Sequence, residues 1–171
     1  MIFTRVLSFA ALLCPTIARA ASNTLTGTWD QVYSNKYVQS TTEMDWKCIK
    51  VHAYAQDKQL NIYKVAHLHG GPQVVITPLV TAHLDNDKIN IQKNARSSAS
   101  PVKKDDTFDV HKYSNDTIII TGDDNPALFV WTREGSQEEP IDIPRLMAFA
   151  ETIGFEVDQD QIVSTYNKTT C

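Results

Sequence analysis

The chain has 171 residues with 20 acidic against 16 basic side chains, so it lacks the basic excess that a nucleic-acid-binding surface requires. Its length suffices for one domain with a sizeable core, and its apolar runs are shorter than the about 20 residues that a membrane-spanning helix needs. We therefore expect a single globular domain that binds no nucleic acid and does not span a membrane.

Residues 1–20 have the pattern of a secretory signal peptide. Arg5 supplies a positive start, the stretch 6–14 is mostly apolar, and Ala18-Arg19-Ala20 fits a small-x-small cleavage site. We therefore expect a leader at 1–20 and a secreted mature domain at 21–171. Removal of the leader takes away Arg5 and Arg19, which leaves 14 basic against 20 acidic residues and a net charge of −6.

From Leu25 to Arg133, short β-like runs alternate with turns rich in Gly, Asn, Asp and Pro at fairly regular spacing. This pattern is typical of a β-sandwich or an up-and-down β-barrel. A longer segment, Ser34–Asp45, separates the first two runs. Eight strands are predicted in chain order: Gly27–Tyr33, Trp46–Tyr54, Gln59–Val65, Val74–Thr81, Lys88–Gln92, Thr107–Tyr113, Thr117–Thr121 and Ala127–Thr132.

Alternation along these strands predicts which side chains face the interior. In the second strand Ile49, Val51 and Ala53 share one parity, and Cys48 has the other, so Cys48 should point outward. The same pattern places Phe108 and Val110 inward in the sixth strand.

A helical period follows the eighth strand. Asp142 suits the N-cap and Pro144 suits the first turn. Apolar residues then recur at helical spacing before Gly154: Leu146, Phe149, Ala150 and Ile153. One amphipathic helix is therefore predicted, and Gln161–Thr165 is a candidate for a last strand.

Two cysteines, Cys48 and Cys171, remain once Cys14 leaves with the leader. In an oxidising compartment this pair favours an intramolecular disulfide over free or intermolecular thiols. Two sequons, at Asn115 and Asn167, are candidate N-glycosylation sites on the surface.

Two motifs resemble those of lipocalins. Gly27-Thr28-Trp29 is similar to the Gly-x-Trp signature of that family, and the apolar strand that ends at Arg133 resembles its third motif, whose Arg packs across the Trp. Where the second motif reads Thr-Asp-Tyr, this chain has His111-Lys112-Tyr113, and only the Tyr matches. The Gly-Phe after the helix and the terminal Cys are similar to apolipoprotein D and its relatives.

The resemblance implies an all-β fold: an eight-stranded antiparallel up-and-down barrel with one C-terminal α-helix packed outside. It gives Gly27, Trp29 and Arg133 structural roles at the closed end, makes Ser34–Asp45 the lid of the open end, and implies a bridge between the cysteine of the second strand and the terminal one. Its implied function is secreted transport of a small hydrophobic ligand, such as a fatty acid, sterol, retinoid or tetrapyrrole.

Ligand-binding residues are predicted from two sources. The resemblance places Ala53 and Phe129 on the cavity wall, and alternation adds the remaining six. The full expected set is Tyr33, Ile49, Val51, Ala53, Phe108, Val110, Phe129 and Trp131.

Other functions remain as alternatives. A barrel filled by its own side chains would leave an interaction protein that works through its loops. A lipocalin-fold enzyme acting on a lipid or carotenoid is a further alternative, although the sequence has no Gly-x-Ser-x-Gly or His-Glu-x-x-His motif. His67 and His69 could offer two imidazoles to a metal, or His69 could help to hold a haem or bilin, but solvated histidines are the simpler interpretation. We expect no catalytic residue, metal or cofactor, and a monomer or weak dimer.

Overall fold

The computed structural model describes residues 25–56, 59–69, 71–85, 87–92, 106–123, 125–139, 141–166 and 171. The expected leader and the sequon at Asn167 lie outside these ranges. Within them, no helix is both long and apolar enough to cross a membrane.

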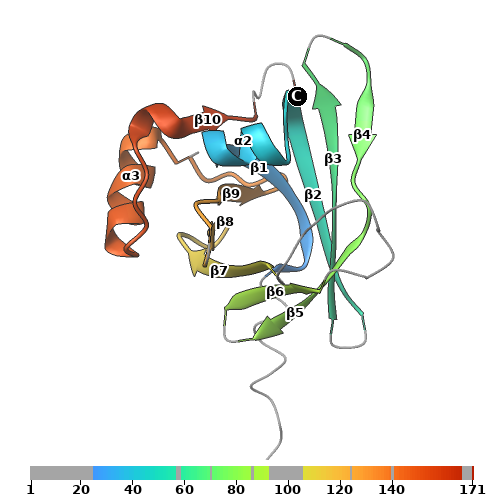
Figure 1. Cartoon of the computed structure of the whole chain (residues 1–171), viewed down its shortest axis with the longest axis horizontal. Helices are drawn as coiled ribbons and strands as arrows, with labels where there is room; N and C mark the ends of the chain where they lie inside the picture. Colours follow the sequence, from blue (N-terminus) through green and yellow to red (C-terminus); the bar gives the residue numbers. More distant parts are fainter. Residues whose placement is uncertain are drawn as a thin grey trace, which may run out of the picture.

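The chain forms a closed antiparallel β-barrel (Figure 1). Eight strands follow one another in the order β1-β2-β3-β5-β6-β7-β8-β9, and β9 pairs back with β1 to close the sheet. The predicted barrel is therefore confirmed. The barrel strands are β1 (Gly27–Asn35), β2 (Trp46–Gln56), β3 (Gln59–Leu68), β5 (Val80–Asp85), β6 (Lys88–Gln92), β7 (Asp106–Lys112), β8 (Thr117–Gly122) and β9 (Leu128–Arg133).

The predicted fourth strand, Val74–Thr81, is divided in two. Its first part is β4 (Val74–Ile76), which pairs with the outer part of β3, and its second part begins β5 at Val80. Pro78 lies between the two parts. Proline lacks the N–H that a continuous strand would donate to its neighbour, which explains the break.

Two bulges interrupt the alternation of side chains. The pairing of β1 with β9 shifts register between Gln31 and Tyr33, and the pairing of β2 with β3 shifts between Lys47 and Lys50. A bulge inserts one extra residue, so side chains beyond it change face. Cys48 has a positive φ of 52° in the second bulge.

The segment predicted as a lid, Ser34–Asp45, begins as the last two residues of β1 and continues as a short helix, α2 (Lys36–Thr41). The Asn35 side chain caps this helix by accepting a hydrogen bond from the Val38 N–H at 3.3 Å. The carbonyl of Val38, whose side chain is buried, accepts a hydrogen bond from the Glu43 N–H at 3.0 Å. The helix therefore fixes the backbone at Glu43.

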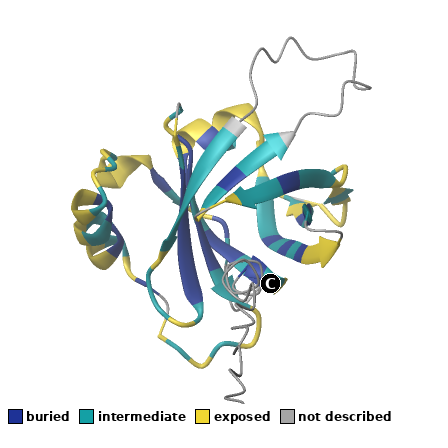
Figure 2. Cartoon of the chain, turned by 90° about the horizontal axis from the view of Figure 1, so that it is seen from below, coloured by how far each residue is buried: buried dark blue, intermediate teal, exposed yellow. Residues whose placement is uncertain are grey.

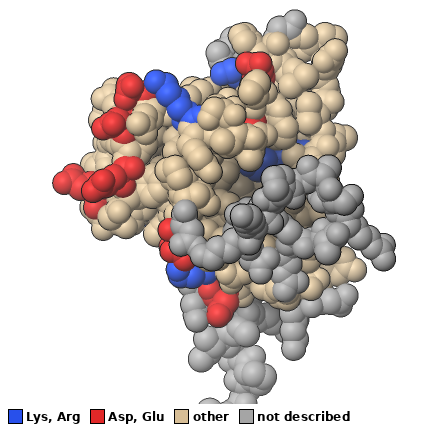
Figure 3. Space-filling model, viewed as in Figure 1, with Lys and Arg blue, Asp and Glu red and all other residues tan. Residues whose placement is uncertain are grey.

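A second helix, α3 (Ile143–Thr152), packs against the outside of the barrel, as predicted (Figure 1). The Asp142 carboxylate caps it by accepting from the Arg145 N–H at 2.8 Å. Leu146 and Ala150 are buried, and Leu146 belongs to an outer cluster with residues of β8 and β9, while the helix keeps an exposed outer face (Figure 2). Acidic side chains gather on this side of the molecule (Figure 3).

The chain ends with a 3-10 turn, η1 (Gln159–Gln161), and a short strand, β10 (Ile162–Ser164), which pairs with β1. Cys171 then forms a disulfide with Cys48 of β2. The predicted bridge is therefore present, and the Cys48 side chain points outward from the barrel to reach it. Beside this bridge, the Cys48 N–H donates to the Thr165 carbonyl at 2.8 Å.

The closed end of the barrel is the end where β1 begins and β9 stops. Trp29 is buried there, and its indole N–H donates to the Leu25 carbonyl at 2.9 Å. The Arg133 guanidinium lies 4.2 Å from the Trp29 ring centroid, a cation–π contact in which the Arg packs across the Trp as the third motif implies. Gly27 has a φ of 125°, and a Cβ there would lie 2.8 Å from Arg133 Nη1, so both the backbone and the space favour glycine.

Candidate functional site

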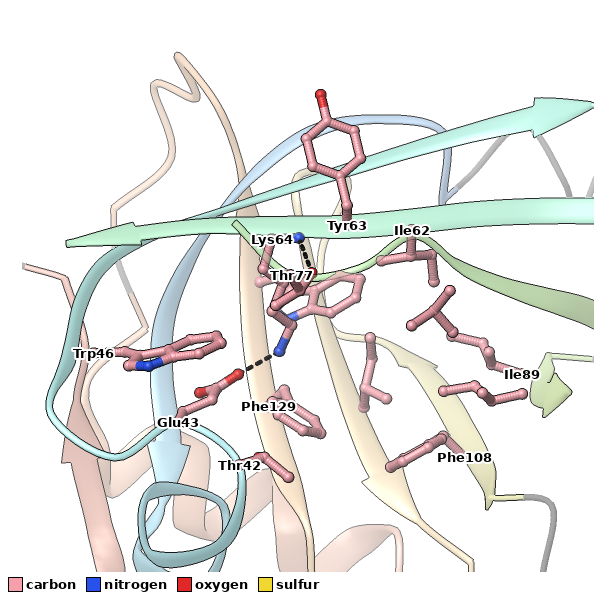
Figure 4. Close-up of a pocket in the computed structure, with 14 residues that line it drawn as sticks. Thr42, Glu43, Trp46, Ile62, Tyr63, Lys64, Thr77, Ile89, Phe108 and Phe129 are labelled. Carbon is pink, nitrogen blue, oxygen red and sulfur yellow. Dashed lines mark hydrogen bonds and ion pairs between the residues drawn. The ribbon is translucent and has the colours of Figure 1, made fainter. Parts of the chain in front are cut away.

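A cavity of about 270 Å³ occupies the open half of the barrel, where β1 leads into α2. It collects side chains from β2, β3, β5, β6, β7, β8 and β9, together with the turn after α2 (Figure 4). Most of these side chains are apolar. The lining residues are Thr42, Glu43, Trp46, Ile62, Tyr63, Lys64, Thr77, Val80, Ile89, Ile91, Phe108, Ile120, Phe129 and Trp131.

Three of the predicted ligand-binding residues line this cavity: Phe108, Phe129 and Trp131. The Phe108 and Phe129 rings meet edge to face, with centroids 6.1 Å apart. Trp131 is almost fully buried, whereas Phe108 and Phe129 are partly exposed to the cavity space. β7 and β9 therefore contribute an aromatic wall.

Four other predicted residues face the interior but do not line the cavity. Ile49, Val51 and Ala53 are buried in the inner core cluster that also contains Trp29, and Val110 packs against the same cluster. Alternation gives the face of a strand on which a side chain lies, but it does not give depth along the barrel. Val51 and Ala53 pair with Trp29 and Gly27 of β1, and so lie toward the closed end.

Tyr33 lies on the other face of β1. Gln31 pairs with the inward-facing Trp131, but after the bulge Tyr33 pairs with Val130, which belongs to the outer cluster beneath α3. Tyr33 packs against that outer cluster as well. Burial and the nearby Asp142 carboxylate raise the pKa of its phenol. The simple alternation used to place Tyr33 inward does not hold across the bulge.

A polar cluster forms one wall of the cavity. Lys64 of β3 forms an ion pair with Glu43, and its ammonium also donates to the Gln31 side-chain carbonyl at 3.0 Å. The Gln31 amide donates to the other Glu43 carboxylate oxygen at 2.6 Å. The Trp131 indole N–H donates to the Gln31 carbonyl at 3.2 Å. Gln31 therefore connects both charged side chains to the aromatic wall.

Burial makes this cluster unusual for charged side chains. Only 2% of the Glu43 side chain and 16% of the Lys64 side chain is exposed. The Lys64 ammonium also lies 4.3 Å from the Phe129 ring centroid, within the range of a cation–π contact. Figure 4 shows Glu43 and Lys64 meeting beside Phe129, while the Tyr63 ring points away from the cavity. Tyr63 stacks instead on His52.

Sequence reasoning missed Gln31, Glu43 and Lys64. A signal for Lys64 was present in β3, because it shares its parity with three buried apolar residues, namely Leu60, Ile62 and Ala66. A lysine in such a row needs a buried partner. The sequence could not identify Glu43 as that partner, since it lies in the turn after α2 and outside any regular strand pattern.

The histidine pair does not form a metal centre in the part of the chain that the structure describes. His67 and His69 are both exposed, and no group of three or more His, Cys, Asp or Glu side chains is arranged there to hold a metal ion. Asn115, the first residue of the described sequon, is exposed in the turn between β7 and β8.

No family model matches the sequence, and the curated proteins contain no match. Solved structures do match. Lobster apocrustacyanin A1 has 14% identity and a TM-score of 0.60, covering 87% of this chain and 81% of its own. A dog lipocalin allergen has 14% identity and a TM-score of 0.55, covering 86% and 97%. Japanin from Rhipicephalus appendiculatus, solved bound to cholesterol, has 10% identity and a TM-score of 0.53, covering 86% and 97%. At these identities the likeness shows that the chain has the lipocalin fold.

Proposed function

We propose that the protein is a carrier that binds a small hydrophobic molecule, such as a fatty acid, sterol, retinoid or tetrapyrrole, inside the barrel. The observation that carries this proposal is the apolar cavity of about 270 Å³ in the open half. Pockets for small molecules occupy roughly 300–1,000 Å³ and combine apolar walls with a few polar groups. This cavity matches that description in chemistry and lies just below the range in size.

The fold and the cavity wall are compatible with the transport of a ligand. Among its described residues the cavity wall contains no cysteine, serine or histidine, and its Lys64 amine and Glu43 carboxylate are paired with each other. Affinity would come from burying apolar surface, at roughly 25 cal/mol per Å² before the costs of association. Japanin, a structure of the same fold, was solved with cholesterol bound. We therefore favour binding over catalysis.

Secretion and an apolipoprotein D-like subtype are parts of the same proposal. The bridge between Cys48 and Cys171 supports an oxidising compartment, because structural disulfides persist there. The leader pattern at 1–20 and the sequons at Asn115 and Asn167 point to the same route. Of the predicted binding residues, Phe108, Phe129 and Trp131 are proposed to contact the ligand directly.

Native mass spectrometry of the secreted protein, followed by organic extraction, tests the carrier function. We expect a bound apolar molecule to be released. If the protein is empty, we expect it to bind N-phenyl-1-naphthylamine, a neutral apolar probe, and to enhance its fluorescence. Ile91→Trp places a larger side chain on the cavity wall and should weaken probe binding. Tyr54→Trp is the matched control, since Tyr54 is exposed and lies outside the cavity. A protein that is empty and does not bind the probe would favour the filled-barrel interaction protein instead.

A further inference from the structure

Two opposite charges lie in the cavity wall and neutralise each other. Glu43 and Lys64 are the only charged side chains among the lining residues that the structure describes. We propose that this pairing makes the cavity selective for uncharged ligands, such as an apolar molecule with a hydroxyl or carbonyl group, over ligands with an ionised carboxylate or ammonium. Among the ligand classes named above, it therefore favours a sterol or a neutral retinoid over an ionised fatty acid. This inference rests on the carrier function proposed above.

The Glu43 carboxylate has both oxygens engaged inside the protein. One accepts from the Lys64 ammonium, and the other accepts from the Gln31 amide at 2.6 Å. The side chain is almost completely buried. A ligand cation that displaced Lys64 would leave its ammonium unpaired against the Phe129 ring, and one that bound beside Lys64 would give the wall a net positive charge.

The Lys64 ammonium is also engaged in contacts inside the protein. Its ammonium has three N–H groups, of which one pairs with Glu43 and another donates to Gln31 at 3.0 Å. The ammonium also lies over the Phe129 ring. A carboxylate that displaced Glu43 would leave that buried side chain charged and without its cation, and one that bound beside Glu43 would give the wall a net negative charge. Both outcomes are unfavourable in an apolar cavity.

Gln31 completes the hydrogen bonding of this wall, because its side chain bonds to Lys64, Glu43 and Trp131. Its carbonyl accepts from both Lys64 and the Trp131 indole, and its amide donates to Glu43. Among the described side chains, every buried nitrogen and oxygen atom has a hydrogen-bond partner. The wall therefore presents a closed polar network, with no counter-charge left for an ionised ligand.

Three ligands of equal chain length test the selectivity: octan-1-ol, octanoate and octylammonium. The cavity volume corresponds to about nine water molecules at roughly 30 Å³ each, which suits an eight-carbon chain. Affinities are measured at neutral pH by displacement of N-phenyl-1-naphthylamine and by calorimetry. We expect octan-1-ol to bind at least about tenfold more tightly than either ion, because an ion loses its hydration and gains no partner.

Substitutions that unbalance the pair should change the preference in opposite directions. Glu43→Gln keeps the shape and one of the two accepted hydrogen bonds but removes the negative charge, so octanoate should gain about tenfold relative to octan-1-ol. Lys64→Met removes the positive charge, so octylammonium should gain instead. The double variant Glu43→Gln with Lys64→Met removes both charges and should restore the preference for octan-1-ol. Lys50→Met is the matched control, because Lys50 forms its ion pairs on the outer surface.

The outcomes separate this inference from the proposed function. If the wild-type protein binds octanoate or octylammonium as tightly as octan-1-ol, the selectivity is wrong although the carrier function stands. If it binds neither the probe nor any of the three ligands, the carrier function fails. Circular dichroism and thermal unfolding establish that each variant is folded, and the wild-type comparison decides the question even if a variant does not fold.

Discussion

The two halves of the barrel interior are built from the same strands but are filled in different ways. At the closed end, Trp29 and Arg133 are stacked and Gly27 leaves room for the guanidinium. In the open half, the same strands contribute Gln31 and Phe129, which border a cavity and a buried ion pair. Trp29 and Gln31 are successive inward-facing residues of β1, yet Trp29 is packed in the closed end and Gln31 lies in the polar wall of the cavity.

This difference suggests a division of roles. The closed end is held by apolar burial and a cation–π contact, which are insensitive to what the open half contains. The open half is fixed by directional contacts: the hydrogen bonds of Gln31, the ion pair of Lys64, and the disulfide that joins the tail to β2. Such contacts hold a cavity open because they position side chains without filling the space between them.

Truncation of one aromatic residue in each half gives the largest expected contrast. Trp29→Ala should lower the free energy of unfolding by about 3–5 kcal/mol, since it removes a fully buried side chain and leaves a new void. Phe129→Ala should cost at most about 2 kcal/mol, because it enlarges a cavity that already exists. Urea unfolding measures both. Equal losses of unfolding free energy would contradict the distinction between a packed closed end and a cavity in the open half.

Reduction of the disulfide removes a contact of the open half. Loss of the bond between Cys48 and Cys171 should lower stability by about 2–4 kcal/mol, because the bond closes a loop across 123 residues of sequence in the unfolded chain. Thermal unfolding with and without reductant measures this loss. Hydrogen exchange should quicken first around Cys48 and Thr165. An unchanged melting temperature would contradict a stabilising role for the bridge.

Surface charges at the closed end should have the smallest effect. Lys50 pairs with Asp30 at 3.0 Å and with Glu134 at 2.6 Å, and the hydrogen bond and charge of Lys50 lower the pKa of the Glu134 carboxyl from its ordinary value of 4.5. Lys50→Met should cost about 1 kcal/mol or less near neutral pH, since the pair with Glu134 is exposed and the pair with Asp30 is only partly buried.

The sign of the pH effect follows from that lowered pKa. A carboxyl whose pKa is lower in the folded state contributes stability above its unfolded value, and this contribution is lost as the pH falls through the folded value. The wild-type protein should therefore lose more stability than Lys50→Met when the pH falls from neutral to well below 4.5. Urea unfolding at both pH values checks this, and parallel losses would show that the ion pairs contribute nothing.

Much of the fold could be predicted because each element depends on local patterns. Short β-like runs between turn residues located the barrel strands, and the Asp142 cap with the helical spacing located α3. The Gly-x-Trp and Arg133 motifs located the closed end. The division of the fourth strand was not predicted, because apolar residues on both sides of Pro78 give one continuous β-like run.

The candidate site was harder to predict, since it depends on depth and on long-range partners. Alternation identified Trp131 and Val51 as interior residues alike, yet only Trp131 reaches the cavity. It also placed Tyr33 inward, although the bulge after Gln31 turns that residue outward. The pairing of Glu43 with Lys64 joins a turn to a strand 21 residues away, and no local pattern reports such a contact.

The bond between Cys48 and Cys171 makes most of the molecule a covalent ring. All strands from β3 to β10 lie within that ring. A protease that cuts a single exposed loop among them therefore separates no fragment, because both ends of the cut remain attached through the disulfide. Nicked protein keeps its whole barrel wall in one molecule, and the cut becomes visible on a gel only after reduction.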